Sequence, residues 1–452
     1  MTEDVKLAWL FTQGSDRREW WRFGLTALGA IAATGLAMAA VVIGSLRGQH
    51  SMSVAAGLLN QPGERTGAVM TLLLLLLAVL GFLGQCTRIG AVHRDKRLAG
   101  LRLAGASPSR TRRVAGLETG LACLLGSLVA TAVVVPTVLS YGQPHVLAWP
   151  AMALVAVLVP GLGAACGVLA LRRVIASPLG EVRRARPQGP GRGTVLTLLV
   201  AAVLIAGALA LVSVPAQAHR DYAMTGPMLV LGLLVLVSVG TVWLSGVCAR
   251  RMGRRMAART DDPASLIAGE RLVDDPWATA RTHAAVMVLT AVATAYVGIR
   301  RTVLDVVALQ ESRYPGGYDM DFYRTGFALT AAAIVLGLLF VLASLAVGTA
   351  ESVASRRDGL AAQVAAGVPR KVLAKALILE TALPLAPAVL LTGILGTALG
   401  AWYAEAANAG VSAFPWAALP LPFVIYAVAL LAAATGIPLL RRTVRPSELR
   451  HA

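Results

Sequence analysis

The sequence predicts an all-α polytopic membrane protein with about ten transmembrane helices. The chain of 452 residues is 57% hydrophobic and 14% charged, with a mean hydropathy of +0.70, which is far more apolar than a soluble domain tolerates. It also contains ten segments with the roughly 20 apolar residues that a helix needs to cross a bilayer. A third observation, a basic stretch that occurs twice, predicts that the helices form two related sets.

The predicted spans follow one another along the chain. In order they cover residues 23–43, 66–86, 114–141, 146–171, 194–214, 228–248, 282–299, 327–348, 376–403 and 417–440. The seventh is the weakest, because it is short and lies between Arg281 and Arg300. We expect a surface helix before the first span and another, over residues 266–281, before the seventh.

The basic residues predict the orientation of these helices. With the N-terminus in the cytoplasm, most of the 41 Lys and Arg residues fall in cytoplasmic segments, and so does the net charge of +18. This asymmetry follows the positive-inside rule and places both termini in the cytoplasm. Because the charge follows the topology, it gives no indication of a nucleic-acid partner.

The repeated stretch covers residues 94–121 and 356–383, each between two long apolar runs. The copies align without a gap, which matches Arg94 with Arg356, Leu98 with Leu360, Gly105 with Gly367 and Glu118 with Glu380. Each copy predicts a basic helix on the cytoplasmic face that stops at a glycine, and the leucines and arginines of the first copy make that helix amphipathic. A new helix then starts, at Ser107 and Pro108 in the first copy, and re-enters the membrane.

A second similarity sets the extent of the duplication, because SPLGEVR at 177–183 resembles RPSELR at 445–450. We therefore predict a first four-span repeat at 1–190, a linker with spans five and six at 191–261, and a second four-span repeat at 262–452. Both repeats have the same orientation, so a pseudo-two-fold axis should lie along the membrane normal. The longest outer segment is 300–326, where residues 303–309 are apolar enough to extend the seventh helix outward.

Several kinds of chemistry find no support in the sequence. The only lysines are Lys6, Lys96, Lys371 and Lys375, and none lies in a phosphate-binding GxxxxGK[ST] loop. There is no HExxH motif and no closely spaced histidine pair, so we expect no metal site. We predict no catalytic residue and no enzymatic activity for this chain.

Only two acidic residues, Glu118 and Glu380, lie within the predicted spans, and both are close to the cytoplasmic ends. An ion-coupled carrier would be expected to hold ionisable groups at mid-membrane, so this class is disfavoured. Two interpretations of the pair remain open. In the first, each glutamate forms a structural ion pair or reaches the membrane interface with its carboxylate; in the second, it acts as a joint between the cytoplasmic helix and the following span.

The repeated motif resembles the FtsX-like, or MacB-type, permease family of ABC transporters. That family has an Arg-rich helix, an Ala/Leu-Gly-Ala break, a basic stretch and a Glu at the start of a span. The first copy fits well, and the second is weaker because Gln363 and Ala365 replace leucines. Ten spans with two such units are similar to the bacitracin-export-type permeases, except that the large extracellular domain of those permeases is missing here.

The resemblance implies a cytoplasmic ABC ATPase as partner, in two copies, with ATP and Mg²⁺ bound by that partner and no cofactor on this chain. It implies that the ATPase docks on Arg94, Arg97, Leu98, Leu101, Arg102 and Gly105, and on Arg356, Leu360, Gln363 and Gly367. The expected function is ATP-driven extraction or export of a hydrophobic compound or peptide at a bacterial plasma membrane, in contact with its lipids. The alternative is a signalling complex that acts on a sensor kinase or a cell-wall hydrolase.

Overall fold

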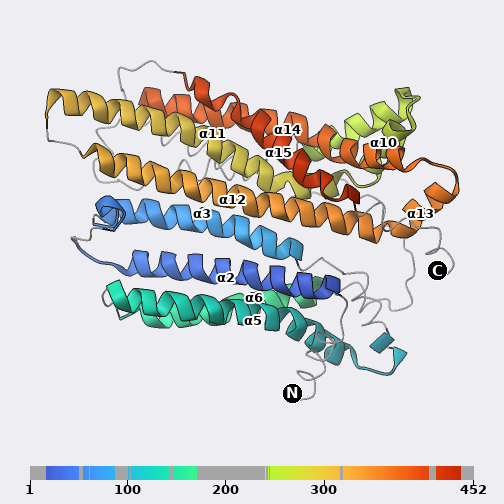
Figure 1. Ribbon diagram of the computed structural model, residues 1–452, viewed down its shortest axis with the longest axis horizontal. Helices are drawn as coiled ribbons and strands as arrows, with labels where there is room; N and C mark the ends of the chain where they lie inside the picture. Colours follow the sequence, from blue (N-terminus) through green and yellow to red (C-terminus); the bar gives the residue numbers. More distant parts are fainter. Residues whose placement is uncertain are drawn as a thin grey trace. The chain divides into compact units, whose positions relative to one another are not determined.

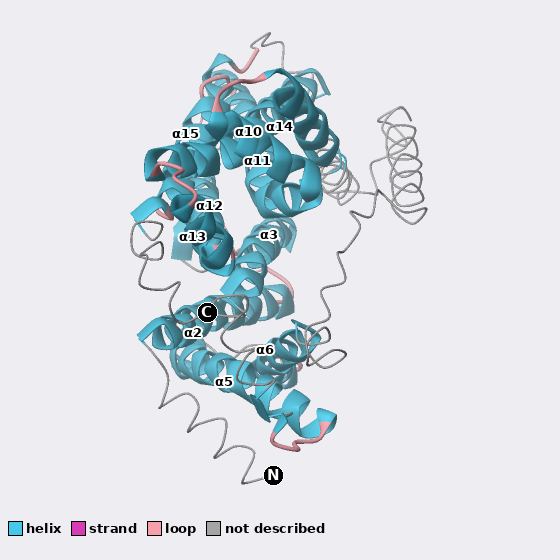
Figure 2. Ribbon diagram, turned by 90° about the vertical axis from the view of Figure 1, so that its right-hand side faces the viewer, coloured by secondary structure: helices cyan, strands magenta, loops and turns pink. Residues whose placement is uncertain are grey.

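The computed structural model describes most of the predicted spans. It covers residues 17–49, 54–60, 62–86, 100–101, 103–141, 146–170, 240, 243, 245–315, 319–406 and 414–438. Across these residues the chain forms helices and connecting turns, with no β-strand in the described part (Figure 2).

Eight of the described helices are long and apolar enough to cross a membrane, which is the architecture of a polytopic helical membrane protein. They match the first four and the last four predicted spans. In chain order these helices are α2 (Arg17–Ser45), α3 (Pro62–Cys86), α5 (Pro108–Tyr141), α6 (Ala148–Ala170), α11 (Pro276–Arg313), α12 (Met320–Ser355), α14 (Arg370–Ala406) and α15 (Leu421–Ala434). The fifth predicted span, and all of the sixth except residues 240, 243 and 245–248, lie outside the described residues.

The chain divides into two compact units. The first comprises residues 1–183 and 328–355, and in it α2 packs against α3, α5 and α6, while α5 also packs against α6 (Figure 1). The second comprises residues 184–327 and 356–452. Here α11 packs against α14 and α15, α14 packs against α15, and the shorter helix α10 (Pro263–Asp274) lies against α14.

The same three pairings therefore occur inside each unit. Among the first four predicted spans and again among the last four, the first span packs on the third and the fourth, and the third packs on the fourth. The remaining helix elements are η1 (Val54–Gly57), α13 (Arg357–Ala365) and η3 (Trp416–Ala418). The predicted division of the sequence at residues 190 and 262 stays a prediction.

Small residues allow the first and third helices of each set to approach closely. A Cβ atom added at Gly126 of α5 would meet the backbone carbonyl oxygen of Ala27 in α2. In the second unit, a Cβ at Gly396 of α14 would meet the carbonyl oxygen of Ala291 in α11. Close backbone approach through small residues is the usual way in which membrane helices associate, since lipid gives no hydrophobic drive for helix pairing.

The structure confirms one predicted extension and corrects one predicted boundary. α11 continues past the seventh predicted span to Arg313 and includes residues 303–309, so the outward extension of the seventh helix is confirmed. The surface helix predicted over residues 266–281 was wrong at its end. It stops at Asp274, and α11 begins two residues later at Pro276, because a proline without an N–H suits the first turn of a helix.

The turn between α2 and α3 is organised by one buried arginine. The Arg65 guanidinium donates to the carbonyl oxygens of Leu46 at 2.9 Å, Leu59 at 2.6 Å and Asn60 at 2.8 Å. It also donates to Gly48 at 2.5 Å. These carbonyls lie past the end of α2 and past η1, so a single side chain satisfies backbone groups that helix ends leave without partners.

Candidate functional site

The two repeated stretches form the same local structure where the sequence predicts a helix stop. At Gly105 and Gly367 the backbone φ is 92° and 93°, in the left-handed region that favours glycine. The N–H of Ala106 donates to the carbonyl of Leu101 at 3.0 Å, and the N–H of Val368 donates to the carbonyl of Gln363 at 3.0 Å. This six-residue closure is the Schellman ending of a helix. We call residues 100–108 and 362–370 the first and second breaks.

A long helix begins at the equivalent position after each break, at Pro108 for α5 and at Arg370 for α14. In the first break, the hydroxyl oxygen of Ser107 accepts from the N–H of Arg110 at 3.3 Å and caps the new helix. In the second break, Pro369 takes this position, and its carbonyl accepts from the N–H of Val372 at 2.9 Å. The predicted stop and restart are thus confirmed in both copies.

The breaks lie at the protein surface. Leu103 is 70% exposed, and Gly105 and Gly367 are exposed as well. On α13, Leu360 is fully buried while Ala362 and Ala365 are exposed, so this helix has an inner face and an outer face. The side-chain carbonyl oxygen of Gln363 is buried without a hydrogen-bond partner.

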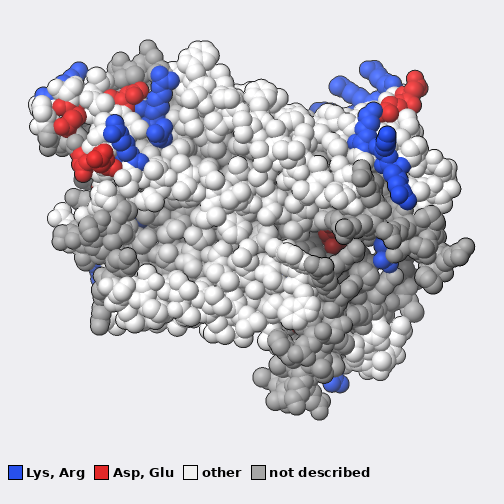
Figure 3. Space-filling view, in the orientation of Figure 1, with Lys and Arg blue, Asp and Glu red and all other residues white. Residues whose placement is uncertain are grey.

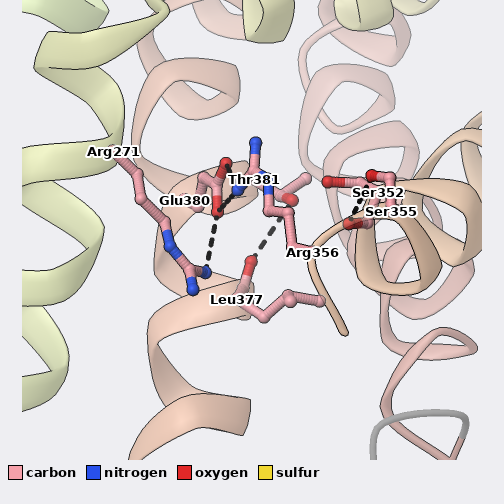
Figure 4. A network of polar contacts seen from close by, with 7 residues as sticks. All are labelled: Arg271, Ser352, Ser355, Arg356, Leu377, Glu380 and Thr381. Atoms are coloured by element: carbon pink, nitrogen blue, oxygen red, sulfur yellow. Dashed lines mark hydrogen bonds and ion pairs between the residues drawn. The ribbon is translucent and has the colours of Figure 1, made fainter. Parts of the chain in front are cut away.

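Glu380 joins three segments of the second unit (Figure 4). Its carboxylate on α14 accepts from Arg356, directly before α13, at 2.9 and 3.2 Å. It also accepts from Arg271 of α10 at 3.4 Å. The Glu380 and Arg271 side chains are 13% and 17% exposed, so this ion pair is largely shielded from water. Glu380 therefore forms a structural ion pair, and because Arg356 directly precedes α13, the same contact also joins the cytoplasmic helix to the following span.

Burial and charge act together on Arg271. Its burial lowers the pKa of the guanidinium, and the nearby Arg356 lowers it further, whereas the negative charge of Glu380 opposes both effects. The carboxylate of Glu380 therefore compensates two guanidinium groups that would repel each other without it.

A second ion pair ties the same helices together on their more exposed side. Asp262 caps α10, because its carboxylate accepts from the N–H of Ser265 at 3.2 Å and from the Ser265 hydroxyl at 2.7 Å. The ammonium group of Lys375 on α14 donates to the same carboxylate at 3.0 Å. These bonds, led by those from Ser265, lower the pKa of Asp262. The N-terminal end of α14 is thus attached to α10 at two places.

The equivalent acid of the first unit is also paired. Glu118 of α5 accepts from the guanidinium of Arg22 on α2, and the residues are 5% and 8% exposed. Here the ion pair connects two spans. No sequence motif pairs Arg22 with Glu118, because the two residues are 96 positions apart.

Not every predicted site residue can be placed. Arg94, Arg97, Leu98 and Arg102 lie outside the described residues. Leu101, Gly105, Arg356, Leu360, Gln363 and Gly367 all lie in or beside the two breaks. Three residues that the sequence analysis did not assign to the site also lie at the contact of α10 with α14. They are Arg271, Asp262 and Lys375. Within the described ranges, no group of three His, Cys, Asp or Glu side chains is arranged to hold a metal ion.

No model of a known protein family matches this chain, and no curated protein sequence matches it either. The resemblance to FtsX-like permeases therefore depends on the repeated motif alone.

Proposed function

We propose that this chain is the membrane subunit of an ABC transporter that receives force from a separate cytoplasmic ATPase at the two breaks. The observation that carries this proposal is that the two breaks have the same local backbone structure. A sequence that serves only to hold a helix end in anionic lipid does not need the same left-handed glycine, the same six-residue closure and the same helix restart twice.

The helices that follow the breaks are suited to transmit motion. α5 has 34 residues and α14 has 37, which at 1.5 Å per residue gives lengths of roughly 50 Å. A bilayer core is roughly 30 Å thick, so each helix reaches beyond it. A displacement applied at a break can thus reach the far side of the membrane along one continuous helix.

The Glu380 cluster supports this role in the second unit. Arg356 lies at the start of α13, and Glu380 lies about three turns into α14, so their ion pair bridges the second break from one side to the other. Arg271 fixes α10 to the same point. Pressure on α13 would consequently move α14 and α10 together rather than bend the chain at Gly367.

The ATPase would act in two copies, one for each break, and would hold ATP and Mg²⁺ itself. The proposed location is a bacterial plasma membrane. The proposed substrate is a hydrophobic compound or peptide taken from the bilayer, because only residues 314–319 connect α11 and α12 where bacitracin-type permeases have an extracellular domain.

The test is a matched pair of glycine substitutions. Gly367→Val places a branched side chain at a φ of 93°, whereas Gly359→Val changes a glycine of α13 that has no positive φ, and a Cβ has open space at both sites. In a complex reconstituted with its ATPase, Gly367→Val is expected to leave ATP hydrolysis running while transport falls about tenfold or more. Equal transport per ATP in wild type and Gly367→Val would refute the proposed coupling. The proposal would also be refuted if the chain, purified from its native membrane, brought no ATPase with it.

A further inference from the structure

A basic helix that the proposed function does not use precedes α10. Residues 245–259 are helical and begin within the last four residues of the sixth predicted span. This helix crosses α10 at very short range. A Cβ added at Gly253 would lie 2.7 Å from the carbonyl oxygen of Gly269, and one added at Gly269 would lie 3.0 Å from the carbonyl oxygen of Gly253. Its glycine side is therefore fixed against α10.

The opposite side carries four exposed arginines. Arg251, Arg254, Arg255 and Arg259 are spaced three and four residues apart, which places them on one face of a helix. We call these four residues the arginine face. None of them forms an ion pair with another described residue. Figure 3 shows basic side chains, with acidic ones beside them, at the end of the second unit where Figure 1 labels α10.

Within the described ranges, no ion pair offsets the charge on this face. Arg251 and Arg255, like Arg255 and Arg259, are like charges at a spacing of four residues, which destabilises a helix. A bound anion would relieve this repulsion. The guanidinium fork matches phosphate oxygens particularly well.

We propose that the arginine face binds the phosphate headgroups of anionic phospholipids. The membrane is the source that the structure favours, because the face begins three residues after the end of an apolar segment, at the depth where headgroups lie. Lipid bound here rests on a helix fixed to α10, and Arg271 of α10 contacts Glu380. Headgroup binding thus acts on the cluster that bridges the second break. The binding itself does not depend on the proposed ATPase.

The experiment compares two variants with the same change in charge. Phosphatidylglycerol, phosphatidylcholine or inorganic phosphate is titrated into the purified full chain in neutral detergent, and bound molecules are counted by native mass spectrometry. In R251Q/R254Q/R255Q/R259Q the apparent Kd for phosphatidylglycerol should rise at least about tenfold. It should change less than about twofold in the control R300Q/R301Q/R313Q/R324Q, whose arginines lie on α11 and α12 at the other end of the unit. Raising the salt from about 0.1 M to about 1 M should weaken wild-type binding, since the Debye length falls from about 10 Å to about 3 Å.

Four outcomes overturn the proposal. They are equal binding by wild type and the quadruple variant, an equal loss in the control, equal binding of phosphatidylcholine, and displacement of the lipid by inorganic phosphate at a comparable concentration. If the quadruple variant loses a protein partner but keeps the lipid, the face is a protein interface and the proposal fails. If the quadruple variant does not fold, R254Q/R255Q replaces it and should still raise the apparent Kd about threefold.

Discussion

At the scale of single residues, Glu380 has the most consequences, since one carboxylate compensates two arginines from different segments. Removal of its charge leaves Arg271 and Arg356 close together without a counter-ion. Breaking a buried ion pair costs roughly 3–5 kcal/mol, but the Arg356 side chain is 39% exposed and partly screened by water. We therefore expect Glu380→Gln to lower the free energy of unfolding by about 2 kcal/mol.

The measurement for Glu380→Gln is thermal unfolding in detergent micelles. The matched control is Glu270→Gln, at an exposed position of α10, which should change stability by less than about 0.5 kcal/mol. If both variants unfold at the wild-type temperature, the Glu380 cluster does not stabilise the second unit.

Asp262 predicts a dependence of stability on pH. Its pKa is lower in the folded state than its ordinary value of 3.8, first through the Ser265 hydroxyl and then through Lys375. The stabilisation is thus present above about pH 4 and is lost as the pH falls through the lowered pKa of the folded state. Asp262→Asn keeps a capping side chain but removes the charge, so its stability should change less with pH below about pH 4 than that of the wild type.

Acid titration of thermal unfolding tests this effect. Parallel pH profiles for wild type and Asp262→Asn would show that the ionised Asp262 carboxylate, with its bonds to Ser265 and Lys375, makes no contribution to stability. The sequence could not have indicated either pair, because Asp262 and Lys375, like Arg271 and Glu380, are brought together only when α10 packs on α14.

At the scale of elements, features set by neighbouring residues were predicted correctly, whereas contacts between residues far apart in the sequence were not. The glycine stop and the restart at Ser107 and Pro108 were correct because caps are set by a few neighbouring residues. The outward extension of the seventh helix was also correct, because the apolar residues 303–309 continue its pattern past Arg300 and Arg301. An arginine at a membrane interface does not end a helix, since its long side chain can reach the polar region.

The close contact of α2 and α5 gives an element-scale prediction. Gly126→Ala puts a methyl group against the backbone of Ala27 and 2.8 Å from the Cβ of Ala30, and backbone cannot move aside as a flexible side chain can. We expect a loss of about 1–3 kcal/mol. Gly35→Ala on α2, where no atom lies within 4 Å, should instead be neutral or stabilise the helix by up to about 1 kcal/mol. Thermal unfolding of both variants measures the difference, and equal midpoints would show that α2 and α5 do not need this contact.

At the scale of the whole molecule, the helical membrane architecture was predictable because apolar runs of about 20 residues have few other uses. The packing partners inside each unit were not predictable. Small residues such as Gly126 and Gly396 favour close helix contact but do not specify which helix they contact. The two units nevertheless share the pairing of first, third and fourth spans. Each unit contains one break, as the proposed ATPase in two copies would require.

Site-specific photo-crosslinking tests the central claim, that both breaks receive force from a cytoplasmic ATPase. A photoreactive amino acid is placed at Leu103 in the first break and at Ala365 in the second, both exposed, and at exposed Leu309 of α11 as the control. We predict that Leu103 and Ala365 each trap an ATP-binding subunit in intact membranes and that Leu309 does not. Failure of both positions to trap such a subunit, or labelling of the two breaks by membrane-impermeant reagents from opposite sides of the membrane, would contradict the account.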